Sequence, residues 1–213
     1  MAKLCVIFDL DGTLVDSEAL CNQAFVDLLP ELNDTVDTLI RRYRGKKLAL
    51  ILSDIAHRLG RPLPDLFEDT YRQRVAELFE RDLKPIPGVA EMLQTIEYPI
   101  CIASSGPRAK ISQALKVSGL AAHFADRIFS SYEVGSWKPE PALFLHAARG
   151  MGFKPEHCVV VEDSEIGIAA AMAAGMKALQ YVSNGEPPLF RNITSFDSMQ
   201  RLPELLEELA QCA

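Results

Sequence analysis

The sequence predicts an α/β fold in which a doubly wound parallel sheet carries an inserted α-helical cap. Short, continuous apolar runs of strand length recur along the chain, and segments with helical spacing of apolar residues lie between them. Strands that alternate with helices favour a parallel sheet, because each parallel connection needs room for a crossover helix. One long segment after the first apolar run has helical spacing only, which indicates an all-helical insert.

The first apolar run, residues 4–8, leads into Asp9-Leu10-Asp11-Gly12-Thr13. Such a run is typical of a buried strand of a parallel sheet, and these sheets carry their chemistry just beyond the carboxyl ends of the strands. Asp9 and Asp11 lie there, and two carboxylates this close repel each other unless a cation or a proton lies between them. The pair indicates a divalent metal site with oxygen ligands.

Two other interpretations of this aspartate pair exist. An EF-hand calcium loop also alternates acidic residues, but it needs glycine at its sixth position, and here glycine is the fourth. That motif is therefore excluded. The remaining alternative is a strand end at which the aspartates only shape a turn.

Residues 16–86 form the predicted helical cap, and residues 1–15 and 87–213 form the predicted core. The polar residues Asp16-Ser17-Glu18 can cap the first cap helix, and Lys84-Pro85-Ile86-Pro87-Gly88 marks the exit. The expected cap helices are residues 19–29, 34–43, 48–59 and 64–81.

The rest of the chain alternates between predicted strands and helices. The expected strands are residues 99–103, 127–130, 158–161 and 176–182. The expected helices are residues 89–96, 108–118, 142–151, 166–174 and 203–210. The helix 166–174 is apolar nearly all round, so we expect its alanines and Met172 to lie in the core.

Polar residues gather where these predicted strands end. Ser104, Ser105 and Gly106 follow the strand 99–103, and Glu162-Asp163 follows the strand 158–161. Ser104 and Asp163 could instead cap helices, although Pro107 suits a first helical position and leaves Gly106 as the natural cap. Lys138 precedes Pro139 at an expected helix start, where the helix dipole disfavours a cation unless an anion is present.

These motifs, in this order, resemble those of the haloacid dehalogenase-like hydrolases, which have a Rossmann-like core and are mostly magnesium-dependent phosphatases. The resemblance implies that Asp9 is a nucleophile that forms an aspartyl phosphate. It implies that Asp11 protonates the leaving oxygen and later deprotonates water, so we expect a raised pKa for Asp11. The Asp9 side chain and the Asp11 backbone carbonyl would bind Mg²⁺.

The same resemblance assigns roles to the later motifs. Ser104 would hydrogen-bond a phosphoryl oxygen, with backbone N–H groups near Ser105 and Gly106 assisting. Lys138 would neutralise the nucleophile and the phosphoryl charge. Asp163 would be a direct ligand of the metal, and Glu162 would bind it directly or through a neighbour.

The insert resembles the cap of the phosphoglucomutase-like branch of this family. Residues 41–47 hold five basic residues and no acid. Such a run can be a solvated face. Because Gly45 to Lys47 matches the cap loop that reads the substrate in this branch, we expect Lys47 and Lys46 to contact an anionic substrate tail.

The expected function is therefore hydrolysis of a small phosphorylated metabolite. Residues 105–107 and 137–143 are similar to bacterial sugar phosphatases, which implies a sugar or sugar-acid phosphate such as 6-phosphogluconate. The alternatives are a hexose-phosphate mutase and a phosphate-binding regulator without turnover. In the β-phosphoglucomutases, a histidine of the first cap helix reaches the counterpart of Asp11, but the matching residue here is Cys21, which favours hydrolysis.

Composition limits the partners and the compartment. The chain has a formal net charge of −7 at pH 7, which argues against a nucleic-acid partner, and its longest strongly apolar tract, residues 166–176, is too short for a membrane span. Its cysteines are odd in number and lack Cys-x-x-Cys spacing, as is typical of free thiols in a reducing cytoplasm. They are Cys5, Cys21, Cys101, Cys158 and Cys212. We expect a cytoplasmic monomer or weak dimer with a small-molecule phosphate ester as its partner.

Overall fold

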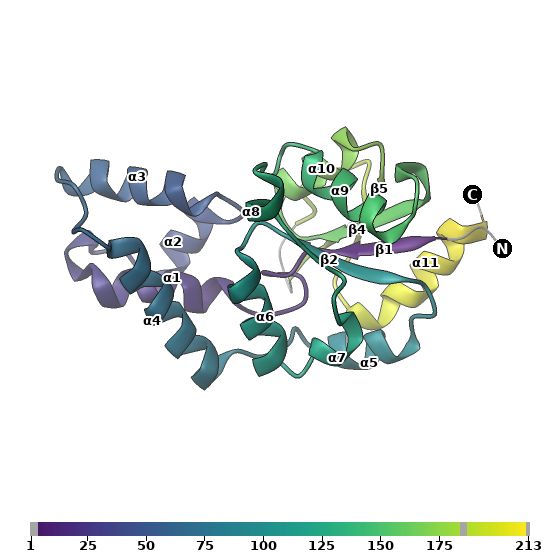
Figure 1. Cartoon of the computed structure of the whole chain (residues 1–213), viewed down its shortest axis with the longest axis horizontal. Helices are drawn as coiled ribbons and strands as arrows, with labels where there is room; N and C mark the ends of the chain where they lie inside the picture. The colour runs from purple at the N-terminus through teal and green to yellow at the C-terminus, as the bar shows by residue number, and fades with distance from the viewer. Residues whose placement is uncertain (1–3, 184–186, 212–213) are drawn as a thin grey trace.

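The computed structural model describes residues 4–183 and 187–211. In these residues, six strands form one sheet in the order β3-β2-β1-β4-β5-β6, and every neighbouring pair is parallel (Figure 1). The strands are β1 (Cys5–Phe8), β2 (Ile100–Ser104), β3 (Ile128–Ser130), β4 (Cys158–Glu162), β5 (Lys177–Tyr181) and β6 (Thr194–Phe196). The predicted doubly wound parallel sheet is confirmed.

Strand β1 lies in the middle of the sheet and is apolar on both faces because helices cover both. Alternate side chains of a strand point to opposite faces, so Val6 and Phe8 pack into one layer and Cys5 and Ile7 into the other. The first layer contains α5 (Val89–Thr95), α6 (Arg108–Val117), α7 (Ala121–Phe124) and α11 (Leu202–Gln211). The second contains α9 (Ala142–Met151) and α10 (Glu165–Ala173).

Four helices follow β1 and form a lobe at one end of the molecule (Figure 1). They are α1 (Glu18–Leu28), α2 (Val36–Tyr43), α3 (Leu48–Leu59) and α4 (Phe67–Asp82). Aromatic side chains hold them together, since Phe25 stacks on Tyr71 with ring centroids 4.2 Å apart and meets Tyr43 edge-on at 6.4 Å. The insert is helical as predicted, and its division from the core at residues 16 and 86 stays a prediction.

The chain enters and leaves this lobe through two segments that lie side by side. The Asp16 N–H donates to the Lys84 carbonyl at 3.0 Å, and the Ile86 N–H donates to the Leu14 carbonyl at 2.9 Å. These bonds fix the start of α1 relative to β1. They hold the residues that follow Asp11 against the end of the sheet.

Some local expectations were wrong or incomplete. Met172 is 47% exposed, because α10 turns one side to solvent. Helix α6 begins at Arg108 as expected, but its N-cap residue is Pro107 and not Gly106. The short helices α7 and α8 (Ser131–Val134) and strand β6 were not predicted, since elements of three or four residues carry no measurable periodicity.

No helix in the described part of the chain is both long and apolar enough to cross a bilayer. Four cysteines are free thiols: Cys5, Cys21, Cys101 and Cys158. Cys212 lies outside the described residues.

Candidate active site

A buried lysine joins two carboxylates at the carboxyl end of β1. The Asp9 N–H donates to the Val161 carbonyl at 2.9 Å, which keeps Asp9 in line with the strand. Lys138 Nζ donates to Asp9 Oδ1 at 2.5 Å and to Glu162 Oε1 at 2.7 Å. Burial alone would lower the pKa of Lys138, but the charges of Asp9 and Glu162 raise it above its ordinary value. Lys138 is therefore a fixed cation in this site.

The other oxygen of Glu162 is held by the first turn of α10. Glu162 Oε2 accepts hydrogen bonds from the Ser164 N–H at 2.6 Å and from Ser164 Oγ at 2.8 Å. A Cβ on Gly167 would lie only 1.8 Å from Glu162 Oε1, so the carboxylate occupies space that a larger residue would fill. Glycine at this helical position makes room for the Glu162 side chain.

Glycine also allows the first motif to approach Asp163. Gly12 has a φ of +82°, and a Cβ there would lie 2.5 Å from Asp163 Oδ2. Thr13 Oγ1 donates to Asp163 Oδ1 at 3.3 Å. The loop after β1 thus touches the carboxylate that follows β4.

Three carboxylates at these strand ends form a group that could hold a metal ion. One oxygen each of Asp9, Glu162 and Asp163 lies within 4.8 Å of the others. Burial raises the pKa of Asp9 to about 8; Lys138 opposes this rise, and the neighbouring carboxylates add to it. Burial, with the charges of Glu162 and Asp9, raises the pKa of Asp163 well above its usual range.

The charges of this group fit a divalent cation. With all three carboxylates ionised, the one ammonium of Lys138 would leave two negative charges unbalanced in a buried site. A hard dication with oxygen ligands, such as Mg²⁺, would balance them. The donor set therefore fits the magnesium ion that the motifs predict.

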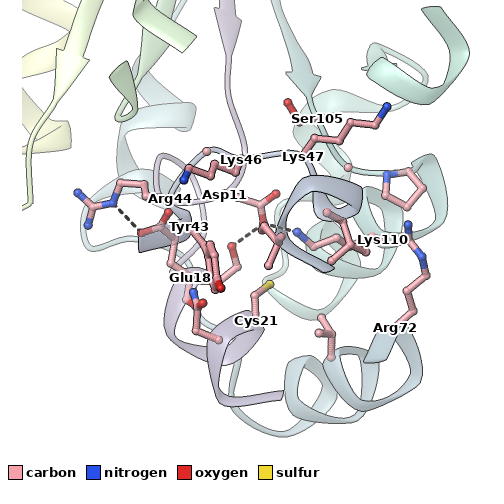
Figure 2. Close-up of a pocket in the computed structure, with 18 of the residues that line it drawn as sticks. Asp11, Glu18, Cys21, Tyr43, Arg44, Lys46, Lys47, Arg72, Ser105 and Lys110 are labelled. Atoms are coloured by element: carbon pink, nitrogen blue, oxygen red, sulfur yellow. Dashed lines mark hydrogen bonds and ion pairs between the residues drawn. The ribbon is translucent and has the colours of Figure 1, made fainter. Parts of the chain in front are cut away.

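Asp11 has different partners from Asp9. Its Oδ1 atom accepts hydrogen bonds from Ser17 Oγ at 2.5 Å and from Lys110 Nζ at 2.7 Å (Figure 2). Burial would raise the pKa of Asp11, but the Lys110 charge and these bonds lower it below its ordinary value. The expected raised pKa is therefore wrong for this arrangement of groups.

Lys110 was missed in the sequence, although a signal for it was present. It lies in the first turn of α6, where the helix dipole disfavours a cation unless an anion is near. The same argument had singled out Lys138. The anion here is Asp11, which the sequence places 99 residues away.

The second motif lies next to this pair. Ser104 is fully buried, and its hydroxyl oxygen accepts the Gly106 N–H at 3.1 Å. Ser105 and Gly106 line the cavity described below, whereas Ser104 is not among its described lining residues.

A cavity of about 460 Å³ lies between the sheet ends and helices α1–α4. Its lining brings together Asp9, Asp11, Lys138, Glu162 and Asp163 with Lys46, Lys47, Lys110, Ser105 and Gly106. The two cap lysines extend in opposite directions from their loop (Figure 2). Lys47 Nζ lies 3.4 Å from the centroid of the Trp137 ring, and Lys46 Nζ lies 6.0 Å from that of Tyr43.

Some residues of the lobe and the core that line this cavity also contact each other directly. Arg72 Nη2 of α4 donates to Tyr132 Oη at 2.8 Å. Gln113 Nε2 of α6 donates to the Ala76 carbonyl at 3.2 Å. Cys21, the residue at the position of the mutase histidine, also lines the cavity. The charged contact to the Asp11 carboxylate is made by Lys110 of the core.

The fold and the carboxylate group at the strand ends define the class of this protein. A model of the haloacid dehalogenase-like hydrolases matches residues 4–175, and the chain belongs to that family. It is therefore a hydrolase, and the family predicted from the motifs is confirmed.

Individual members of the family are similar over nearly the whole chain. The chain is 36% identical over 205 residues to the 6-phosphogluconate phosphatase of Escherichia coli (strain K12), which covers 94% of this chain and 93% of that protein. A haloacid dehalogenase-like protein of unknown function from Agrobacterium tumefaciens superposes with a TM-score of 0.83 at 32% identity, over 98% of this chain and 99% of that one. A family hydrolase from Deinococcus radiodurans R1, with bound phosphate and sodium, superposes with a TM-score of 0.78 at 28% identity, over 99% of this chain and 97% of that one.

Proposed function

We propose that this enzyme is a magnesium-dependent phosphatase that hydrolyses a small sugar or sugar-acid phosphate through an aspartyl phosphate on Asp9. The observation that carries the proposal is the buried Asp9 carboxylate, held by Lys138 beside Glu162 and Asp163. A phosphate ester resists hydrolysis because its anionic phosphoryl group repels an anionic nucleophile. A site that concentrates positive charge around a fixed carboxylate overcomes that repulsion.

In this proposal, the Asp9 carboxylate attacks phosphorus, and Lys138 balances the negative charges of that carboxylate and of the phosphoryl group. Asp9, Asp163 and the Asp11 backbone carbonyl would hold Mg²⁺, and Glu162 would support them, because both its oxygens already accept hydrogen bonds. When bound, Mg²⁺ draws negative charge from the phosphoryl oxygens. Attack breaks the bond between phosphorus and the ester oxygen and forms the bond to the Asp9 carboxylate.

Asp11 would act as acid and then as base. Its lowered pKa means that it begins ionised. An arriving phosphoryl dianion raises that pKa by like-charge repulsion, so Asp11 takes a proton from solvent and gives it to the leaving oxygen. The resulting carboxylate then removes a proton from the water that attacks phosphorus and releases Asp9.

The phosphoryl oxygens would be held by the loop after β2. The Ser104 hydroxyl accepts the Gly106 N–H and keeps its own proton to donate. The Ser105 N–H would assist, and the Gly106 N–H would exchange its bond to Ser104 for a phosphoryl oxygen. Lys46 and Lys47 would meet an anionic group at the far end of the substrate.

The size of the cavity supports a substrate larger than a phosphate group. A volume of about 460 Å³ falls in the usual range of small-molecule sites. The Escherichia coli relative acts on 6-phosphogluconate, which has a phosphoryl group at one end and a carboxylate at the other. We take this sugar acid as the leading candidate substrate, because cap lysines and a phosphoryl site would meet its two ends.

Release of inorganic phosphate from a panel of esters with Mg²⁺ tests the proposal. The panel contains 6-phosphogluconate, hexose phosphates, hexitol phosphates and a simple aryl phosphate. We expect turnover of several esters, with sugar-acid or sugar phosphates preferred. Absence of turnover of every ester would favour the regulator without catalysis.

A second assay separates hydrolysis from phosphoryl return. The enzyme is incubated with Mg²⁺, β-glucose 1-phosphate and a catalytic amount of the bisphosphate, and the products are followed by phosphorus NMR. We expect inorganic phosphate to form faster than glucose 6-phosphate. Cys21 takes the position of the mutase histidine, and its thiol is too weak a hydrogen-bond donor to link Asp11 to the closing of the cap. The opposite order would establish a mutase.

We also propose that the enzyme works in the cytoplasm as a monomer or weak dimer, without a nucleic-acid or membrane partner. The free thiols of Cys5, Cys21, Cys101 and Cys158 suit a reducing compartment. Light scattering at several protein concentrations would determine the oligomeric state.

A further inference from the structure

The two oxygens of the Asp11 carboxylate have different surroundings. Oδ1 accepts hydrogen bonds from Ser17 Oγ at 2.5 Å and from Lys110 Nζ at 2.7 Å. Oδ2 accepts none from the described residues, and it is not among their buried atoms without a partner, which are Asn22 Oδ1 and Ser131 Oγ. Oδ2 is therefore accessible, on a side chain that is 28% exposed and lines the cavity.

These bonds decide which oxygen of Asp11 can carry a proton. Each carboxyl oxygen has about two lone-pair sites, and the two donors occupy both sites of Oδ1. A protonated Asp11 that keeps these bonds therefore has its proton on Oδ2. The donors come from the start of α1 and from α6, so they also hold the carboxyl group against rotation.

Both donors are themselves held in place. A Cβ on Gly106 would lie 3.4 Å from Lys110 Cδ, so the stem of the lysine packs against the loop after β2. Lys110 Nζ lies 5.7 Å from the centroid of the Phe79 ring of α4, within the range of a cation–π interaction. Ser17 is fully buried, and although it is the N-cap residue of α1, its hydroxyl makes no capping bond and serves Asp11 instead.

We propose that Lys110 is a positioning residue that, together with Ser17, orients Asp11 so that Oδ2 delivers the proton to the leaving oxygen. This inference rests on the proposed phosphatase function and adds the class of ester that needs such an acid. A sugar or sugar-acid phosphate leaves as a strongly basic alkoxide, which must be protonated as its bond to phosphorus breaks. An aryl ester such as 4-nitrophenyl phosphate leaves as a stable phenolate and needs no proton. Orientation of Asp11 therefore favours esters of alcohols over aryl esters.

Two variants and two kinds of ester test the assignment. Lys110→Met keeps the length of the side chain and removes one donor, and Ser17→Ala removes the other donor without a change of charge. The measured quantity is the ratio of kcat/KM for the best sugar or sugar-acid phosphate of the panel to kcat/KM for 4-nitrophenyl phosphate. Each protein is assayed with Mg²⁺ at its own pH optimum, so that a change in the charge of Asp11 does not enter the comparison. We expect the ratio to fall about tenfold in each variant, the value of one hydrogen bond.

Lys116→Met is the matched control, because Lys116 is an exposed lysine in the last turn of the same helix. The ratio should stay within about twofold of the wild-type value in this variant, and circular dichroism establishes that all the variants are folded.

Two results would overturn the assignment while the phosphatase proposal stands. If Lys110→Met lowers kcat/KM equally for both esters, the ratio is kept and Lys110 is only structural. If the ratio falls in Lys110→Met but not in Ser17→Ala, Lys110 acts through its charge and not by orienting the carboxyl group. If the wild-type enzyme hydrolyses no phosphate ester, the proposed function fails, and this assignment fails with it.

Discussion

Replacement of Gly167 by alanine tests how the site is built. In an ordinary helix interior, alanine is favoured over glycine by about 1 kcal/mol. Here the new Cβ would lie 1.8 Å from Glu162 Oε1 and 1.9 Å from its carboxylate carbon, far inside contact distance. Glu162 must therefore leave its position between Lys138 and Ser164.

The cost follows from the bonds that Glu162 would lose. It accepts hydrogen bonds from Lys138 at 2.7 Å and from Ser164 at 2.6 and 2.8 Å. Each hydrogen bond to a charged group is worth roughly 1.5–3 kcal/mol. Loss of two of these three bonds, less the gain of about 1 kcal/mol in helix propensity, lowers the free energy of unfolding by about 2–5 kcal/mol. For a chain of this size, thermal unfolding followed by circular dichroism should show Tm lower by roughly 5–15 °C.

Gly60→Ala is the control for this substitution. Gly60 ends α3 with a φ of +65°, and a Cβ there would meet nothing within 4 Å. Only the left-handed backbone is strained, so the free energy of unfolding should fall by about 1–2 kcal/mol. Phosphatase activity should be lost in Gly167→Ala and kept in Gly60→Ala. A Gly167→Ala protein as stable and as active as the wild type would refute the account of how Glu162 is held.

Two substitutions test the roles of Asp9 and Asp11. Asp9→Asn should lower kcat at least ~100-fold, because the amide is no nucleophile, and its Tm should stay equal or rise, because one of several buried negative charges is removed. The measurement is hydrolysis of an aryl phosphate at equal protein concentration. Residual activity of several per cent would exclude Asp9 as the nucleophile. Lys110→Met should move the basic limb of the pH profile of kcat/KM upward by about one pH unit or more, because Asp11 must be protonated to release the leaving oxygen. The sign follows because Lys110 holds the pKa of Asp11 low; without it, burial is unopposed, and Asp11 becomes protonated at higher pH. An unmoved basic limb would show that the contact between Lys110 and Asp11 has no influence on the reaction.

The sequence was sufficient for five of the six described strands of the sheet and for the carboxylates that follow them. The apolar run before Asp9 predicts a strand buried on both faces, and the carboxyl ends of parallel strands must meet at one edge, so Asp9 and Asp163 are brought together as expected. Helix α3 spans Leu48–Leu59 as predicted, because its apolar spacing is long and regular. Its end at Gly60 was marked by the glycine itself.

Other features depend on contacts that no local pattern records. Ser17 was expected to cap α1, and it is the N-cap residue, yet its hydroxyl bonds Asp11 and makes no capping bond. The pKa of Asp11 has the opposite direction from the expected one, because Lys110 approaches from α6.

The central claim is that a divalent metal, held by buried carboxylates around Asp9, is required for phosphate-ester hydrolysis. The most direct measurement is phosphate release by enzyme that has been treated with excess EDTA, dialysed, and then titrated with Mg²⁺. The account predicts no release after chelation and full recovery with Mg²⁺, because an oxygen-only site prefers hard cations. Undiminished hydrolysis in excess EDTA would contradict it.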